Sequence, residues 1–236
     1  MDRAASSSLR RPRRTQAERR AAARDRLLKA AAELIAECGL AAVTLARVGE
    51  RAGYSRGIAN HHFGTKAALI EELISQVEHE FVAATAPVRS LDASVDELVT
   101  TSSIFIGLLE DLPAIHRAFL VLWASAVADD ELRPRMAASD AAFRDAVTAI
   151  VERGKACGEV DDSLDADTIA VMLLGQLRGV ALQHLIAGDA IDLAHVGRGL
   201  EAALRALLKP RESGGARGPA RRIAGSRAAQ HGRVPP

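Results

Sequence analysis

Aromatic residues are scarce in this sequence. Phe, Trp and Tyr together make up 3% of the 236 residues, whereas apolar residues make up 48%. An apolar share rich in Ala, Leu and Val favours a helical protein over a β-sandwich, because strands draw on aromatic and β-branched side chains. The scarcity also argues against an aromatic cage for a cationic ligand.

Metal-binding motifs, long apolar runs and catalytic motifs are also absent. Cys38 and Cys157 have no CxxC spacing and no histidine cluster nearby, so we expect no metal site and interpret both as buried free thiols. The nearest approach to a membrane span, residues 168–187, is interrupted by polar side chains, and the N-terminus lacks the apolar run of a signal peptide. No Ser/His/Asp set, carboxylate pair or phosphate loop supports an enzyme or a cofactor. We therefore expect a cytoplasmic protein that is neither an enzyme nor a membrane protein.

Charge is distributed unevenly along the chain. Residues 1–64 carry 13 Lys and Arg against 6 Asp and Glu, a formal charge of +7. Residues 65–209 carry 12 against 23, a charge of −11, and residues 210–236 are basic again at +5. A basic N-terminal part on an acidic body is typical of a protein that presents one end to a polyanion, because the body itself would repel DNA.

Residues 44–63 have the pattern of two short helices joined by a tight turn. Thr44 is placed to cap the first helix, whose apolar residues recur at helical spacing. Gly53 supplies the positive φ that a chain reversal needs. Ser55 then caps a second helix, whose exposed positions carry Arg56, Asn60, His61 and His62. This layout predicts a helix-turn-helix, with a second helix suited to a DNA major groove.

Helical patterns continue on both sides of this unit. Thr15 and Glu18 have capping-box spacing, which predicts a first helix from there to Cys38. A fourth helix is expected from residue 65 to about 84, and Ser94 with Glu97 forms a second capping box that opens the next one. Further helices are expected at about 114–128, 130–155, 165–187 and 191–209. Acidic residues before the helix at 165 are better explained as helix N-terminal acids than as a calcium loop.

The residues from Arg24 to about Leu73 resemble the DNA-binding domain of the TetR family of bacterial regulators. The sequence departs from the family pattern at Val48-Gly49, Tyr54 and Asn60. The matching residues are Leu28, Ala31, Ala32, Gly39, Thr44, Ala52, Gly53, Ser55, Gly57, His62, Phe63, Lys66, Ala68 and Leu69. The resemblance implies an all-α fold, with an N-terminal three-helix helix-turn-helix DNA-binding domain and a C-terminal helical ligand-binding and dimerisation domain.

The expected domains follow from this division. Residues 15–64 form the DNA-binding domain, and residues 65–209 form a linker helix with the ligand-binding and dimerisation domain. Residues 1–14 and 210–236 lack the apolar side chains for a core and are predicted to be a disordered basic arm and a disordered basic tail.

DNA contacts are predicted for the second helix of the helix-turn-helix and its flanks. Arg56 is expected to bind guanine, because a guanidinium donates to O6 and N7 together. Asn60 either pairs with adenine or replaces a phosphate-contacting Tyr of the family. Metal binding by the adjacent histidines is disfavoured, because neighbours on a helix point about 100° apart. The full predicted set is Thr44, Ser55, Arg56, Gly57, Asn60, His61, His62 and Lys66.

Ligand and dimer contacts are expected in the body, where the resemblance implies an enclosed small-molecule site and a four-helix dimer interface built from the last two helices. For every ligand candidate, simple core packing is the alternative. The ligand candidates are Phe105, His116, Phe119, Trp123, Met172, Gln176 and His184. The dimer candidates are Met172, Gly175, Gly179, Leu200, Leu204 and Leu207.

The sequence therefore predicts a homodimeric transcriptional regulator, most simply a repressor, that binds a palindromic operator in double-stranded DNA and is released from it by an unknown small-molecule ligand. Two alternatives remain open. A helical adaptor of the same fold would use the head against protein, and a helical enzyme would show substrate turnover.

Overall fold

The computed structural model describes residues 15–90 and 93–210, and the regular secondary structure within these residues is entirely helical. This confirms the all-α prediction. The α-helices are α1 (Gln16–Cys38), α2 (Leu45–Arg51), α3 (Arg56–Phe63), α4 (Lys66–Thr85), α5 (Ser94–Leu108), α6 (Ala114–Ser125), α7 (Arg133–Ala156), α8 (Ala166–Ala187) and α9 (Leu193–Leu208). Short 3-10 turns occupy Leu40–Ala42, Ala86–Ser90 and Gly188–Ala190. The predicted basic arm and, apart from Pro210, the predicted basic tail lie outside the described residues.

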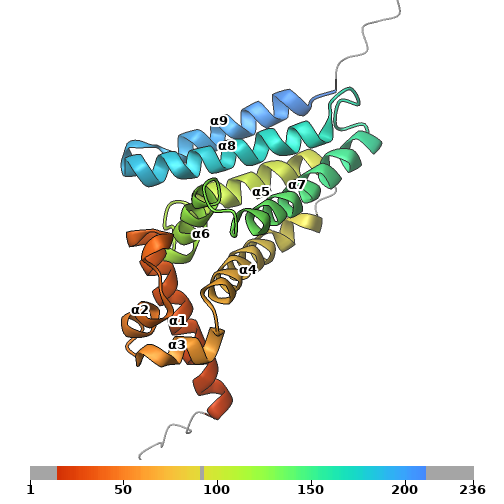
Figure 1. Ribbon diagram of the computed structural model, residues 1–236. Coiled ribbons are helices and arrows are strands. Elements are labelled where there is room, and N and C mark those ends of the chain that lie inside the picture. Colours follow the sequence, from red (N-terminus) through yellow and green to blue (C-terminus); the bar gives the residue numbers. More distant parts are fainter. Residues whose placement is uncertain (1–14, 91–92, 211–236) are drawn as a thin grey trace, which may run out of the picture.

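The helices form a small head and a larger body (Figure 1). Helices α1, α2 and α3 make the head, and α5, α7, α8 and α9 stack at the other end, with α4 and α6 between the two parts. Arg135 at the start of α7 fastens α4 to the body, because its guanidinium donates two hydrogen bonds to Glu78, at 3.0 and 2.9 Å, and one to Glu71.

Local capping rules set most helix starts in the head. Thr15 and Glu18 form the predicted capping box, with the Thr15 amide 2.8 Å from Glu18 Oε2. Thr44 and Thr65 each accept a hydrogen bond from the amide three residues on, at 3.2 and 3.0 Å. Gly53 has the expected positive φ, 77°. Ser55 occupies the N-cap position of α3, but its hydroxyl makes no capping hydrogen bond, so that part of the prediction is wrong.

Gly49 explains one departure from the family pattern. A Cβ at this position would lie 2.8 Å from the backbone oxygen of Ser55, closer than real Cβ contacts allow. The turn between α2 and α3 therefore brings the two backbones together so tightly that only glycine fits at residue 49.

The predicted capping box at Ser94 and Glu97 is wrong. Ser94 is already the first residue of α5, and the Ser94 amide donates to Glu159 Oε2 at 2.7 Å. Glu97 is 4% exposed and forms an ion pair with Arg153 of α7. Leaving a buried carboxylate without a charged partner costs more free energy than leaving a helix end uncapped. Glu97 therefore pairs with Arg153, which is 56 residues away in the sequence.

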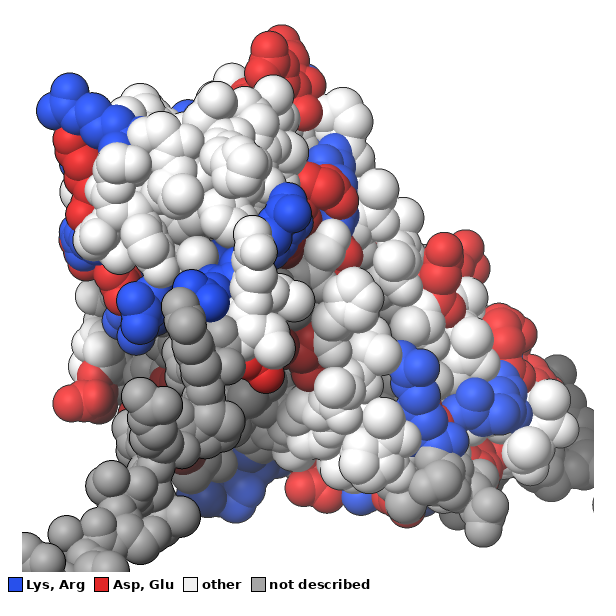
Figure 2. Space-filling view, turned by 90° about the horizontal axis from the view of Figure 1, so that it is seen from below, with Lys and Arg blue, Asp and Glu red and all other residues white. Residues whose placement is uncertain are grey.

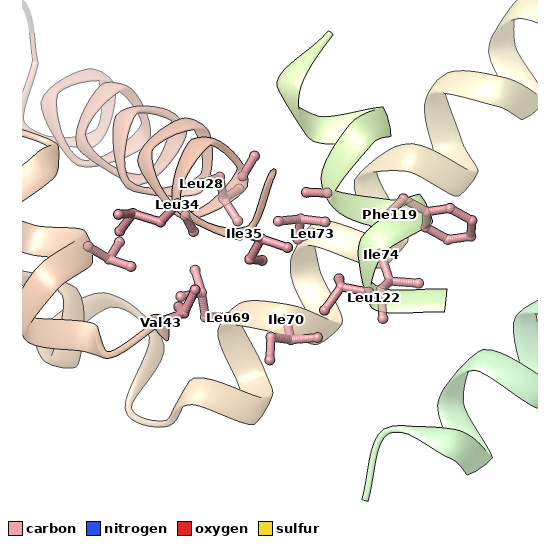
Figure 3. Close-up of a cluster of buried hydrophobic side chains, with 14 of the residues drawn as sticks. Leu28, Leu34, Ile35, Val43, Leu69, Ile70, Leu73, Ile74, Phe119 and Leu122 are labelled. Atoms are coloured by element: carbon pink, nitrogen blue, oxygen red, sulfur yellow. The ribbon is translucent and has the colours of Figure 1, made fainter. Parts of the chain in front are cut away.

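Two hydrophobic clusters form the core. The first joins the head to α4 and α6, and Figure 3 shows Leu28, Ile35, Leu73 and Leu122 converging in it. The second lies among α5, α7, α8 and α9. Because α6 contributes to the first cluster, the apolar core of the head continues into the body.

Two further expectations, that both cysteines are buried and that no helix could span a membrane, are corrected. Cys38 and Cys157 are both exposed free thiols, because each sits at the end of a helix rather than on a packed face. Residues 166–190 include one helix long and apolar enough to cross a membrane by length and composition, although the sequence was expected to hold none. One such helix is weak evidence for a span, and a third of its most apolar window is buried within the protein.

Candidate nucleic-acid interface and ligand cavity

Helix α3 presents a polar surface and buries an apolar one. Ala59 and Phe63 are buried, while Arg56, Gly57, Asn60 and His61 are exposed. Nothing lies within 4 Å of a Cβ built on Gly57, so the surface beside it is open for a close approach. Arg56, Asn60 and His61 are thus exposed as the sequence predicted, whereas His62 is half-buried; their contact with DNA stays a prediction.

Arg56 is held by a carboxylate that the sequence analysis did not single out. Its Nε donates to Glu50 Oε1 across the α2–α3 turn. The Arg56 side chain is still 79% exposed and that of Glu50 is 47% exposed, so both remain accessible to a partner. The sequence does contain an indication of this ion pair, because Glu50 is an acidic residue just before the turn.

His61 and His62 differ in their surroundings. Their ring centroids are 5.8 Å apart in an edge-on arrangement, and the described residues hold no group of three metal-ligating side chains. His62 is half-buried, and burial, followed by the charge of Arg20, lowers its pKa. In the free protein the neutral form of His62 is therefore favoured near neutral pH.

Lys66 and Arg24 tie the head to α4. Lys66 Nζ donates to the backbone oxygen of Leu40 at 2.8 Å, so this predicted DNA contact also has a structural role. Arg24 of α1 forms an ion pair with Glu72 of α4, and its guanidinium lies 5.1 Å from the ring centroid of Phe63 in α3. Arg24 of α1 thereby contacts both the end of α3 and α4.

The positive charge of the head comes largely from outside the described residues. Residues 15–64 carry 8 Lys and Arg against 5 Asp and Glu, a net +3 of the +7 counted for residues 1–64. Figure 2 views the molecule from the head end and shows basic side chains interspersed with acidic and uncharged ones. DNA binding through this surface alone would depend on contacts by individual side chains more than on the attraction of a broad basic patch.

An apolar cavity of about 140 Å³ lies in the body among α4, α5, α6, α7 and α8. Phe105, His116 and Phe119 of the predicted ligand set line it. Most of the wall was not predicted from the sequence, because its residues are mainly aliphatic and belong to no distinguishing motif. Further wall residues are Val77, Phe81, Thr85, Arg89, Glu97, Leu98, Thr101, Ser102, Leu108, Leu109, Leu112, Leu120, Phe143, Ala146, Val147, Ile150, Leu173, Leu174, Leu177 and Arg178.

Four predicted ligand residues do not line this cavity. Met172 and Gln176 are exposed on the opposite side of α8, and His184 lies beyond the cavity near the end of that helix. Trp123 has a structural role, since its Nε1 donates to Asp140 Oδ2 at 3.1 Å and the guanidinium of Arg178 lies 4.8 Å from its ring centroid. The expectation is corrected for these residues.

The outer face of α8 is apolar, small-residue-rich and uncovered. A shallow groove there is lined by Met172, Gly175, Gln176, Gly179, Val180 and Gln183. Exposed apolar side chains flank it, with Val171 57% and Ile186 87% exposed. On α9, Leu207 is 39% exposed, but Leu204 is only 3% exposed and belongs to the core of its own chain, so its predicted place in a dimer interface is wrong.

These features define a class of protein, an all-α helix-turn-helix protein whose head is packed against a body that encloses an apolar cavity. The chain belongs to the TetR family of bacterial transcriptional regulators. Residues 27–73 match the family described as bacterial regulatory proteins, tetR family, and residues 104–209 match the C-terminal region of BetI-type transcriptional repressors.

Individual relatives agree with this assignment. The regulator BetI of Stenotrophomonas maltophilia is 32% identical over 120 residues, which span 50% of this chain and 61% of that protein. The regulator CymR of Pseudomonas putida is 29% identical over 191 residues, spanning 75% and 86% of the two chains. A solved TetR-family regulator from Rhodococcus sp. is 26% identical, with a TM-score of 0.67 over 80% of this chain and 100% of that one.

Proposed function

We propose that this protein is a homodimeric repressor that binds a palindromic operator in the bacterial cytoplasm through α3 and is released from it by a small molecule bound in the body. The observation that carries the proposal is the position of α6. Phe119 of α6 lines the cavity and also belongs to the core cluster of the head, so a ligand in the cavity touches a residue that supports the DNA-binding unit.

The dimer is proposed from the outer face of α8 and α9. A monomer would leave Val171, Met172, Ile186 and Leu207 in water around a groove of glycines, whereas a second copy would cover them. In a symmetric dimer the two α3 helices would meet successive major grooves, about 34–36 Å apart. A ligand that favours a different separation would release DNA by its differential affinity for the two states.

Selection of bound sequences from random duplex DNA at a stated salt concentration tests the proposal. We expect enrichment of a palindrome, and an affinity that falls steeply as salt rises, because phosphate contacts release counterions. Enrichment of no sequence, with binding to a protein partner that is insensitive to salt, would favour the adaptor alternative.

Arg56→Ala is expected to weaken binding to the selected operator by about 1–3 kcal/mol and to relax selectivity at one base position, because the bidentate guanine contact is lost. Binding to operator variants with each base substituted in turn measures both effects. Arg51→Ala is the matched control, since Arg51 pairs with Glu33 and Glu37 of α1 rather than facing outward from α3. Equal losses on operator and random DNA for Arg56→Ala would contradict its role in base recognition.

A further inference from the structure

The charged side chains deep in the cavity wall are already neutralised from outside the cavity. Glu97 pairs with Arg153, and the Arg178 guanidinium lies 2.5 Å from Asp140. Neither partner is part of the wall. A ligand charge would therefore find no free counter-charge among these groups.

His116 adds no charge to this balance. Its Nε2 lies 3.6 Å from Glu80 of α4, and burial lowers the pKa of its ring, against the opposing effect of that carboxylate. At neutral pH the ring is uncharged. Arg89 is the remaining ionic wall residue, and it is exposed, so its charge stays in contact with water.

Two wall hydroxyls, those of Thr85 and Ser102, have partners within their own helices. Thr85 Oγ1 donates to the Phe81 backbone oxygen at 2.9 Å, and Ser102 Oγ donates to the Leu98 backbone oxygen at 2.7 Å. The surface that a ligand would contact is therefore mostly leucine, valine and phenylalanine. The uncharged polar groups that remain in it are Thr101 and the His116 ring, whose buried Nδ1 has no hydrogen-bond partner among the described residues.

We infer that the cavity binds an uncharged, largely apolar molecule about the size of a single substituted ring. Its volume of about 140 Å³ is close to the ~150 Å³ of an engineered apolar cavity that binds benzene. An ionised ligand buried among the apolar wall residues, away from the exposed Arg89, would lose its hydration without gaining a counter-ion. This inference rests on one part of the proposed function, namely that the cavity is the ligand site.

Toluene, benzoate and benzylammonium test the inference as one-ring probes that differ mainly in charge. Isothermal titration calorimetry with the full-length protein measures their binding. We expect toluene to bind at least about tenfold more tightly than either ion, because burying an unpaired charge is unfavourable. Equal or tighter binding of benzoate or benzylammonium would overturn the inference.

Matched Val→Phe variants locate the binding. Val147 lines the cavity, so Val147→Phe is expected to fill it and abolish toluene binding, whereas Val127 is 77% exposed and Val127→Phe should change nothing. Retained toluene binding in a folded Val147→Phe protein would place the site elsewhere. If Val147→Phe does not fold, Thr101→Leu supplies a smaller filling change in the same wall and should weaken toluene binding. Toluene binding without operator release would count against the proposed function and leave the inferred ligand chemistry intact.

A second inference comes independently from the head. Glu50 accepts a hydrogen bond from Arg56 Nε, and no hydrogen bond from the two terminal nitrogens of that guanidinium is found among the described residues, so these remain available as a donor pair. Guanine offers two acceptors, O6 and N7, to such a pair. A hydrogen bond at Nε restricts the orientations of the guanidinium plane, whereas a guanidinium without it can turn to any nearby phosphate.

We propose that Glu50 is a positioning residue for Arg56 and raises the preference for operator over random DNA in two ways. Its oxygen orients the guanidinium toward a base, and its negative charge repels phosphates when no base contact compensates. This inference rests on the proposed role of α3 in DNA binding.

Two substitutions of Glu50 separate these effects. Glu50→Ala is expected to lower discrimination at the base position read by Arg56 by about tenfold, since the orienting oxygen is lost. Glu50→Gln keeps an acceptor oxygen and should retain most of that discrimination, while both variants bind random DNA more tightly because the charge is gone. Asp25→Asn is the control, as it removes one exposed head carboxylate for which no contact with Arg56 is found among the described residues.

Binding titrations on operator, single-base variants and random duplex give the outcome. If Arg56→Ala loses discrimination at this base position but Glu50→Ala keeps it in full, Arg56 reads the base without help from Glu50. That result would refute the positioning role of Glu50 alone. If Arg56→Ala also keeps full discrimination, the proposed base contact fails as well. A double variant Glu50→Ala/Arg56→Ala should discriminate no worse than Arg56→Ala, because Glu50 acts through Arg56.

Discussion

Asp140→Ala is expected to lower the free energy of unfolding by about 3–5 kcal/mol, because it leaves a buried guanidinium without its counter-ion. The Arg178 side chain is 6% exposed, and Asp140 Oδ1 lies 2.5 Å from its Nη1. Burial already lowers the pKa of Arg178, and the Asp140 carboxylate opposes that effect. The substitution also removes the acceptor for Trp123 Nε1. Urea unfolding at a fixed protein concentration measures the loss.

Two comparisons make this prediction specific. Asp130→Ala removes a surface ion pair with Arg133, whose side chains are 88% and 53% exposed, and should cost no more than about 1 kcal/mol. Asp140→Leu combined with Arg178→Met replaces the buried pair with apolar groups and should recover much of the loss. If Asp140→Ala lowers the free energy of unfolding as little as Asp130→Ala does, then Arg178 is not buried against Asp140 as the structure indicates.

Gly175→Leu is expected to convert the proposed dimer largely into monomers. In the single chain nothing lies within 4 Å of a Cβ built at Gly175, so the fold itself accommodates the larger side chain. Leucine is also a better helix former than glycine, by about 1 kcal/mol. Any loss therefore arises at a partner, where overpacking costs about 1–3 kcal/mol at each of the two symmetry-related positions.

Sedimentation velocity over a range of protein concentrations measures the change in dimerisation. Gly107→Leu is the matched control, because Gly107 lies on α5, away from the outer face of α8, and its Cβ would likewise meet nothing within 4 Å. A Gly175→Leu protein that sediments as the unchanged dimer would move the interface away from α8.

The parts of the fold that the sequence predicted are those governed by nearby residues. Thr15 with Glu18, and Thr44, cap helices through atoms three positions apart, so spacing alone identifies them. Ser94 and Glu97 satisfied the same spacing rule, but Glu97 pairs with Arg153 instead. A partner 56 residues away leaves no local pattern, and the sequence therefore gave no warning.

The cavity wall was less predictable, for a geometric reason. Met172 and Gln176 drew attention on α8 by their chemistry, yet Leu173 and Leu177, one position further along, face the cavity. A rotation of one residue, about 100°, decides which side of a helix points inward. When both faces of a helix are apolar, the sequence does not indicate which leucines face inward.

The division of the core at α6 limits how the protein can be re-engineered. Phe119 and Leu120 are adjacent in sequence, yet Phe119 belongs to the cluster under the head and Leu120 to the cluster of the body. A chimaera that joined residues 15–64 to a different sensor would cut away the α4 and α6 side chains that complete the core of the head. The smallest transplantable DNA-binding module therefore includes α4 and α6, and a new sensor body would have to be built around α6 rather than attached at residue 64.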